Sequence, residues 1–239
     1  MKSYAKTDVG VRRDVNQDYF FATEKATGSF QNLYIVADGM GGHAAGDFAS
    51  KLCVNSMVSF ISNTNIKTPV SIFNEAVAFG NSEVFNASIS NPALAGMGTT
   101  VVAATIMKNK LYVANIGDSR LYLIKDSITQ ITNDHSLVSE MVRRGDLTES
   151  QARIHPQKNI ITRALGIDPT VVADSFELAI DKGDKILLCS DGLTNMVEDY
   201  DILYIVNHSE TLKEAVDTLI DRANEAGGMD NITAVLVEV

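Results

Sequence analysis

The feature that most constrains the fold is a pair of strand-like stretches that are apolar throughout. These stretches are "TTVVAATIM" at residues 99–107 and "KILLCS" at residues 185–190. Strands that lack polar alternation are typical of sheets buried on both faces. Strand patterns also cluster and helical patterns come in pairs, which favours an α+β fold with antiparallel sheets over a doubly wound parallel sheet. We therefore expect two sheets packed together with helices outside.

Hydrophobic periodicity predicts the other elements. Strand patterns cover residues 3–7, 19–23, 33–37, 110–115, 120–124, 127–131, 171–177 and 231–239. Helical patterns cover residues 44–62 and 70–88, and an unbroken apolar stripe at helical spacing runs from Leu212 to Ala223. Residues 134–166 are polar, mixed helical and irregular. Because no linker or repeat divides the chain, we expect one domain over residues 1–239.

Composition excludes several classes of function. The chain of 239 residues is 45% hydrophobic and carries a formal net charge of -10, which argues against partners such as nucleic acid or anionic membrane. Cys53 and Cys189 belong to no metal-ligand pattern and are expected to be free thiols. The N-terminus has no signal-peptide pattern and no apolar run reaches membrane-spanning length. We expect a cytoplasmic protein.

A glycine-rich stretch, "LYIVADGMGGHAAGDFAS" at residues 33–50, fits three motifs. A dinucleotide fingerprint would need a βαβ unit and an acidic residue about 20 positions later, but a second helix follows and no acidic residue lies between Asp47 and Glu75. A phosphate-binding loop would need Lys and Ser or Thr where Asp47 and Phe48 stand. The third interpretation makes Asp38 the functional residue.

Aspartates recur at the ends of predicted strands, next to Gly or Asn in four cases and within "NQD" in the case of Asp18. The positions are Asp18, Asp38, Asp118, Asp191 and Asp230. Each one alone is an ordinary turn signal. Gathered at one edge of a packed sheet, however, they would repel each other without cations. Oxygen ligands suit Mg²⁺ or Mn²⁺, and a pair of ions about 3.5–4 Å apart would serve phosphate-ester hydrolysis.

The ordered motifs of the chain resemble those of a known family. "GVRRDVNQD", "VADGMGGHAAG", "GMGTT", "ANIGDSRLYLI", "TNDHS", "CSDGL" and "GGMDNIT" follow one another from residue 10 to residue 233. Together they resemble the metal-dependent protein phosphatases (PPM, type 2C) in their compact bacterial form. The resemblance implies an α-β-β-α sandwich, Mn²⁺ or Mg²⁺ dependence and dephosphorylation of phosphoserine and phosphothreonine.

The resemblance also implies roles for the aspartates. Asp38 would bridge two metal ions, with the backbone carbonyl of Gly39 on one of them. Asp191 and Asp230 would complete the other ion. Asp18 would hold metal-bound waters, and Asp118 with Asp191 would form a third, weaker metal position.

Three further features carry expectations from the family. Arg13 is the expected phosphate clamp, whereas without the resemblance Arg12 and Arg13 would be interpreted as a solvated pair. His43 is either the general acid for the leaving group or a residue that caps or packs at the start of a helix. Residues 143–166 resemble the family's flap beside the active site, where substrate choice is expected to be tuned.

Other motif residues are expected to support the site rather than to react. Thr100 and Asn231 are predicted structural supports, and Asp134 and His135 are predicted to open the flap segment. Gln17 stands where many family members have Glu, so a neutral amide would hold any water there.

The implied function is a monomeric Ser/Thr phosphoprotein phosphatase that opposes a Hanks-type kinase. Two alternatives stay open at this point. One is a catalytically silent phosphatase-like module that only docks or senses. The other is a metallophosphohydrolase with a narrow substrate range, such as nucleotides or one phosphorylated regulator.

Overall fold

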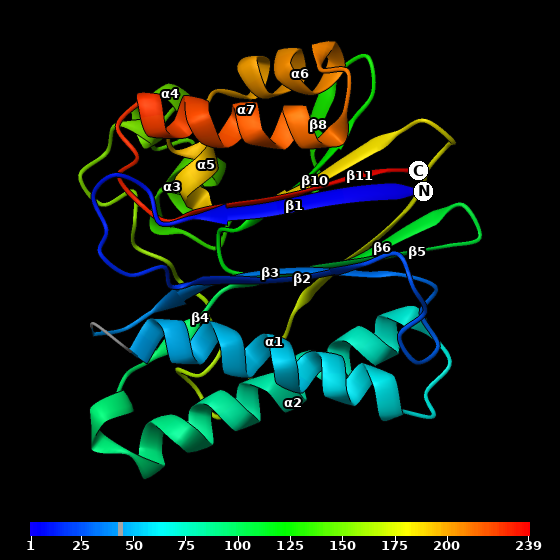
Figure 1. The fold of residues 1–239 in the computed structure, drawn as a ribbon. Helices are drawn as coiled ribbons and strands as arrows, with labels where there is room; N and C mark the ends of the chain where they lie inside the picture. Colours follow the sequence, from blue (N-terminus) through cyan, green and yellow to red (C-terminus); the bar gives the residue numbers. More distant parts are fainter. Residues whose placement is uncertain (43–44) are drawn as a thin grey trace.

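Two antiparallel β-sheets pack face to face between two layers of helices in the computed structural model, which describes residues 1–42 and 45–239 (Figure 1). This arrangement confirms the predicted α+β sandwich. The first sheet contains, in spatial order, β1 (Lys2–Asp8), β11 (Ile232–Glu238), β10 (Lys185–Cys189), β7 (Arg120–Ile124) and β8 (Ile128–Gln130). The second contains β2 (Asp18–Thr23), β3 (Leu33–Met40), β5 (Val101–Met107), β6 (Lys110–Ile116) and β9 (Asp174–Ala179), with short β4 (Gly98–Thr99) paired to β3.

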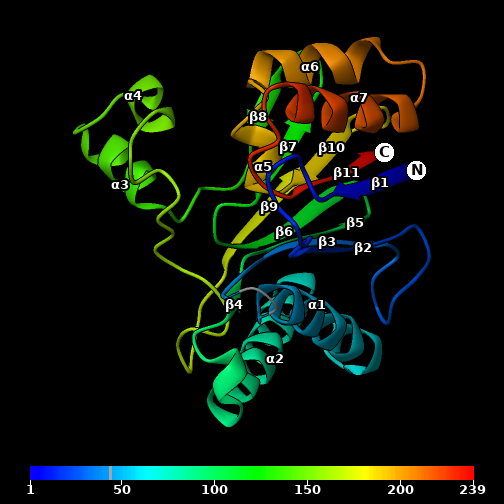
Figure 2. The same ribbon diagram turned by 60° about the vertical axis from the view of Figure 1, so that its left-hand side comes forward.

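The helices divide between the two outer faces. The second sheet is covered by α1 (Ala45–Asn63) and α2 (Pro69–Ser90), which a short 3-10 turn, η1 (Pro92–Leu94), follows. The first sheet is covered by α5 (Asp191–Thr194), α6 (Asp199–His208) and α7 (Leu212–Glu225). Figure 2 shows α3 (Leu137–Arg144) and α4 (Glu149–Arg153) standing outside these layers. Across the described residues, every helix is too short or too polar to cross a membrane.

Three apolar cores explain the strand patterns. One core lies between the sheets and includes Val102, Leu188 and Val235, while each of the other two lies between a sheet and its helices. A central strand such as β5 therefore contacts apolar groups on both faces, and its first six residues are buried. This burial is the physical reason for the continuously apolar sequence of that strand.

The observed elements depart from the prediction in several places: β3 extends to Met40, three residues beyond its predicted end, and the four-residue helix α5 is absent from the prediction. The strand predicted at residues 171–177 begins three residues later, at Asp174, where pairing with Asn115 of β6 starts. The helix α6 is absent from the sequence prediction. Its buried positions, Ile202 and Val206, form a stripe too short to stand out from a strand-like apolar run.

One close backbone approach fixes the junction between α5 and β11. A methyl group built on Gly192 would lie 2.0 Å from the carbonyl oxygen of Asn231. Since real carbon–oxygen contacts are far longer, position 192 accepts glycine alone without movement of the backbone. The contact holds Asp191 and Asp230 next to each other, because each is the immediate neighbour of one of these residues.

We predict that Gly192→Ala lowers the free energy of unfolding by about 1–3 kcal/mol, because the added methyl group overpacks this junction. Helix propensity alone would favour the alanine by roughly 1 kcal/mol, so the expected sign is opposite to that of propensity. Gly42→Ala is the control, since nothing in the described part of the chain lies within 4 Å of its added methyl group. Urea unfolding measures both, and equal stabilities for the two variants would contradict the packing argument.

Candidate metal centre

Five aspartates from separate segments face one another where the ends of the two sheets meet. Asp18 of β2 pairs directly with Asp38 of β3. Asp191 begins α5 immediately after β10, and Asp230 lies two residues before β11. Asp118 follows β6 by two residues. The fold therefore brings together all five strand-end aspartates of the sequence prediction.

Burial and mutual repulsion raise the pKa values of four of these carboxyl groups. Burial raises the pKa of Asp38 well above 3.8, and the charges of the other four add to the effect. The pKa of Asp18 rises to about 7, first through burial and then through Asp191 and Asp230. Burial likewise raises the pKa values of Asp118 and Asp191. A cluster that resists ionisation in this way is a candidate functional site and favours a cation as its partner.

Two carboxylate oxygens in the cluster are buried without a hydrogen-bond donor in the described part of the chain. Ser190 and Thr233 donate from 2.7 Å each to Oδ2 of Asp18, but its Oδ1 has no partner. Asn195 donates to Oδ2 of Asp191 from 2.9 Å, and its Oδ1 likewise has none. A buried oxygen without a partner is costly, so these atoms are suited to a cation.

The carbonyl of Gly39 is kept clear by a second glycine. A methyl group on Gly46, in the first turn of α1, would lie 2.7 Å from the Gly39 oxygen. A methyl group on Gly39 would lie 2.0 Å from the carbonyl oxygen of Gly46. Both positions therefore need glycine, and a side chain at position 46 would crowd the Gly39 carbonyl.

Hydrogen-bond donors of the protein occupy both carboxylate oxygens of Asp230. Arg13 Nη2 donates to Asp230 Oδ2 from 2.8 Å, and the Asn231 amide donates to Asp230 Oδ1 from 2.9 Å. In residues 1–42 and 45–239, no three His, Cys, Asp or Glu side chains stand close enough around one point to hold an ion. The carboxylate and carbonyl oxygens are the kind of donors that Mg²⁺ or Mn²⁺ prefers, and the side chains would have to rotate to coordinate an ion.

Hydrogen bonds from two predicted supports brace the backbone beneath the carboxylates. The Asp38 amide donates to Thr100 Oγ1 from 2.9 Å, and the Thr100 amide donates to the Asp38 carbonyl from 2.8 Å. Asn231 donates to the carbonyls of Val9 and Val15 and accepts from the Gln17 amide at 2.8 Å. The predicted supporting roles of Thr100 and Asn231 agree with these bonds.

Arg13 lies at the exposed rim of the cluster, where its side chain is 47% accessible and bonded to Asp230. This position is close to the carboxylates, as a phosphate clamp requires. His43, the other predicted catalytic residue, lies outside the described residues.

A polar network ties the Asp118 loop to the flap. His135 Nδ1 accepts from the Gly117 amide at 3.0 Å, and its Nε2 lies 3.1 Å from Asp174 Oδ2. The acceptor role of Nδ1 places the proton on Nε2, so the ring donates to Asp174. Arg163 Nη1 binds the other oxygen of Asp174 at 2.6 Å.

Sequence analysis did not identify Asp174, Arg163 or the partly buried ion pair between Arg120 and Asp134. Arg120 donates to both oxygens of Asp134 at 2.7–3.1 Å. The "TNDHS" motif and the Arg two residues after Asp118 were available signals, but nothing in their spacing revealed the partners.

Comparisons with known proteins agree with this fold and this site. The family model described as "Protein phosphatase 2C" matches residues 17–232. The chain is 41% identical over 243 residues to a protein named serine/threonine phosphatase stp from Listeria monocytogenes, covering 100% of this chain and 96% of the relative. The crystal structure of serine/threonine phosphatase Stp1 from Staphylococcus aureus superposes with a TM-score of 0.93 at 33% identity, covering 100% of this chain and 94% of that one.

The chain belongs to the protein phosphatase 2C family, whose catalysis is metal-dependent. A further similar structure is the catalytic domain of the serine/threonine protein phosphatase PstP in complex with two manganese ions. It superposes with a TM-score of 0.88 at 35% identity, covering 99% of this chain and 97% of that one. Its bound ions agree with the donor chemistry of the acidic cluster described above.

We predict that Asp18→Asn gains stability relative to the wild type as the pH rises from 3.8 to about 7 in EDTA-treated protein. The unfolded chain loses the Asp18 proton near 3.8, whereas the folded protein keeps it until about 7. The folded state therefore binds more protons in this window, and the wild type loses stability as the pH rises. His135, whose pKa burial lowers, contributes the opposite slope below 6.5, but that contribution cancels in the difference.

Melting temperatures of both proteins across this pH range measure the effect. Saturating Mn²⁺ should reverse the order above pH 6, because ligand binding stabilises the wild type more than a variant with a weakened site. A difference in melting temperature that stays constant with pH in EDTA would show that Asp18 is not held in its protonated form.

Proposed function

We propose that this protein phosphatase 2C member hydrolyses phosphoserine and phosphothreonine in proteins at the acidic cluster, with two or three Mn²⁺ or Mg²⁺ ions. The observation that carries the proposal is the group of buried strand-end carboxylates, in which one oxygen each of Asp18 and Asp191 has no hydrogen-bond partner among the described residues. When bound, the cations would lower the pKa of an attacking water and neutralise the charge of the phosphate.

The carboxylates are proposed to share the work of holding the ions. Asp38 lies centrally, since the charges of the other four aspartates all act on it, and it is the proposed bridging ligand. Asp191 and Asp230 would hold one ion together with it, and the Gly39 carbonyl would contribute to the other. Asp118, whose pKa is raised by burial and then by Asp191, is proposed to contribute to a third ion with Asp191.

Arg13 is the proposed phosphate clamp. A planar guanidinium can bind two phosphate oxygens at once, which Lys cannot do with the same geometry. Its present bond to Asp230 keeps the guanidinium at the rim of the cluster. Release of that carboxylate to a cation would free Arg13 for the substrate, so the two events are expected to be coupled.

In the reaction, water attacks phosphorus in line, a new phosphorus–oxygen bond forms, and the bond to the serine or threonine oxygen breaks. The attacking water gives up a proton, and the leaving alkoxide takes one. His43 is the proposed donor to the alkoxide, with the capping role as the alternative.

A phosphoprotein substrate implies a cognate Ser/Thr kinase, and we place both in the cytoplasm with the phosphatase acting as a monomer. The intact cluster argues against a silent docking module, because a decayed site would be expected to lose at least one carboxylate or Arg13. A metallophosphohydrolase with narrow specificity would use the same residues, and the substrate panel below separates it from a general phosphatase.

The proposed activity is tested with p-nitrophenyl phosphate, a phosphothreonine peptide and a nucleoside triphosphate, each with Mn²⁺ and with EDTA. We expect release of phosphate from the first two with Mn²⁺, loss in EDTA, and a decrease of more than about a hundredfold in Asp38→Ala. Substitution of a residue that only supports a metal ligand typically lowers metal affinity or activity 10–100-fold, so the loss of a direct ligand is expected to lower activity further. Turnover of the nucleotide alone would instead support the narrow hydrolase.

For Arg13 we predict that Arg13→Ala lowers kcat/KM for the phosphopeptide about 10–100-fold, since it removes charge-assisted hydrogen bonds worth roughly 1.5–3 kcal/mol. Arg12→Ala is the matched control, because Arg12 is an exposed neighbour of the same charge. Steady-state kinetics with Mn²⁺ measures both, and equal losses would mean that general electrostatic attraction, not a clamp, is responsible.

For His43 we predict that His43→Ala slows hydrolysis of the phosphothreonine peptide about a hundredfold or more, while p-nitrophenyl phosphate is affected far less. The nitrophenolate leaving group needs little protonation, whereas the threonine alkoxide needs a full proton. Rates with the two substrates at saturating Mn²⁺ decide the point, and a similar decrease with both would favour the capping role.

A further inference from the structure

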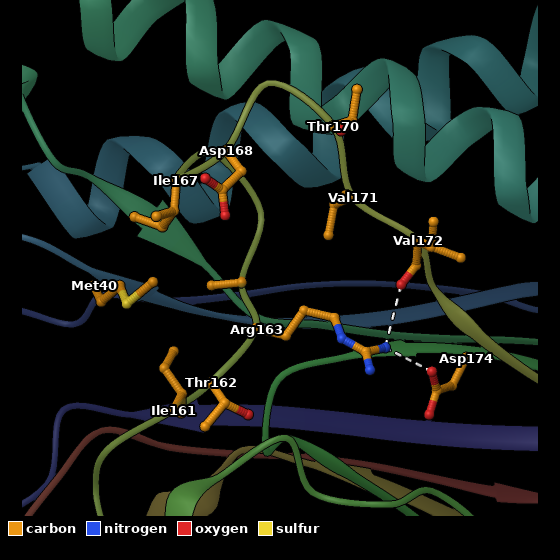
Figure 3. Close-up of a pocket in the computed structure, with 11 residues that line it drawn as sticks. Met40, Ile161, Thr162, Arg163, Ile167, Asp168, Thr170, Val171, Val172 and Asp174 are labelled. Carbon is orange, nitrogen blue, oxygen red and sulfur yellow. Dashed lines mark hydrogen bonds and ion pairs between the residues drawn. The ribbon is translucent and has the colours of Figure 1, made fainter.

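A groove of about 560 Å³ opens at the end of β3, between Met40 and the chain that returns from the flap (Figure 3). One wall is Met40 at the end of β3, and the rest comes from the chain between Ile161 and Asp174, which returns from the flap to β9. The lining combines aliphatic side chains with two threonines, one arginine and two aspartates.

The groove reaches the end of β3, the strand that carries Asp38. Met40 is two residues beyond Asp38 on the same strand. A methyl group on Gly98 would lie 2.7 Å from Met40 Cε and 3.0 Å from Ile167 Cδ1, so both lining side chains reach the same glycine. Thr99 and Leu165 also exchange two backbone hydrogen bonds of 3.1 and 2.9 Å, which hold the groove-lining chain around residue 165 against β4.

The charged groups of the lining are largely satisfied within the protein. Arg163 Nη1 donates to Asp174 Oδ1 at 2.6 Å and to the Val172 carbonyl at 3.3 Å, as the dashed lines in Figure 3 show. The Arg163 guanidinium thus connects the strand start at Asp174 with the preceding chain at Val172, and both segments line the groove. Aliphatic side chains of the groove remain accessible to a ligand, since Val172 is 78% exposed and Ile167 is 45% exposed.

The charge of the neighbouring flap indicates what kind of ligand approaches. Residues 143–166 carry five basic side chains against two acidic ones, whereas the whole chain has a net charge of -10. A basic segment on an acidic protein attracts an anionic partner to this side of the molecule. A phosphorylated polypeptide would be attracted by this charge and would also have side chains that can enter the groove. Its phosphate would bind at the acidic cluster together with the cations.

We propose that the groove binds an aliphatic side chain close to the phosphorylated residue of the substrate protein, and this inference rests on the proposed function. The groove then selects among phosphoproteins by the residues next to the phosphate, while the acidic cluster carries out the same chemistry on all of them. Six aliphatic side chains and five polar ones line the groove, and the aliphatic ones supply the contact surface for such a substrate side chain.

The test compares two phosphothreonine peptides that differ at the positions on both sides of the phosphothreonine, where one has leucine and the other glycine. With the Mn²⁺-loaded wild type we expect kcat/KM to be about tenfold higher for the leucine peptide, mainly through a lower KM. Val172→Ser removes apolar surface from the groove, and Thr170→Trp fills it. In both variants the ratio between the two peptides should fall towards one.

Ile154→Ser is the matched control. Ile154 is an aliphatic residue of the same flap with 83% exposure, but it does not line the groove. This variant should keep the tenfold ratio. A wild-type ratio near one, or a ratio that persists in both Val172→Ser and Thr170→Trp, would overturn the proposal. A ratio lost equally in Ile154→Ser would also overturn it, because binding would then be spread over the flap.

Two further measurements separate failure of the groove from failure of the proposed function. Wild-type turnover of p-nitrophenyl phosphate reports the chemistry without any peptide. Equilibrium binding of the two fluorescently labelled peptides, followed by anisotropy, reports the groove even if neither peptide is hydrolysed. Equal affinities would reject the groove, whereas tighter binding of the leucine peptide without any turnover would reject the phosphatase activity alone.

Discussion

Repulsion among buried carboxylates is the constraint on which the rest of this structure depends. Burial raises the pKa of Asp38 well above its ordinary value, and four neighbouring aspartates add to the effect. A fold that gains nothing from such a cluster would lose stability by keeping it. The arrangement becomes favourable once a cation supplies the missing charge, so stability and chemistry at this site are linked.

The surrounding scaffold can be understood as the means of holding these groups in place. Antiparallel pairing sets Asp18 opposite Asp38, and the contact of Gly192 with the Asn231 carbonyl joins the segments that carry Asp191 and Asp230. The two-sheet core makes the strands rigid, while the flap outside the layers adds a groove next to the same strand ends. Rigid support for the reacting groups and a separate surface for selectivity are thus built from different parts of the chain.

Sequence alone was sufficient for the fold class and for the identity of the clustered aspartates, because both leave local signals. Continuously apolar strands report burial on two faces, and an aspartate next to glycine or asparagine marks a strand end. The partners of His135 were not predictable, since Asp174 lies 39 positions away and no periodicity connects the two. The helix α6 and the start of β9 were missed or misplaced because tertiary packing, rather than local pattern, decides them.

The central claim is that the five aspartates form a site for divalent cations. Isothermal titration of Mn²⁺ into EDTA-stripped protein, with Asp38→Asn and Asp217→Asn as the paired variants, tests it most directly. Asp217 is a surface carboxylate bonded to Lys6 and so serves as the control. The account predicts binding of at least two ions to the wild type and to Asp217→Asn, and loss of this binding in Asp38→Asn. Equal Mn²⁺ binding by all three proteins, or none by the wild type, would contradict it.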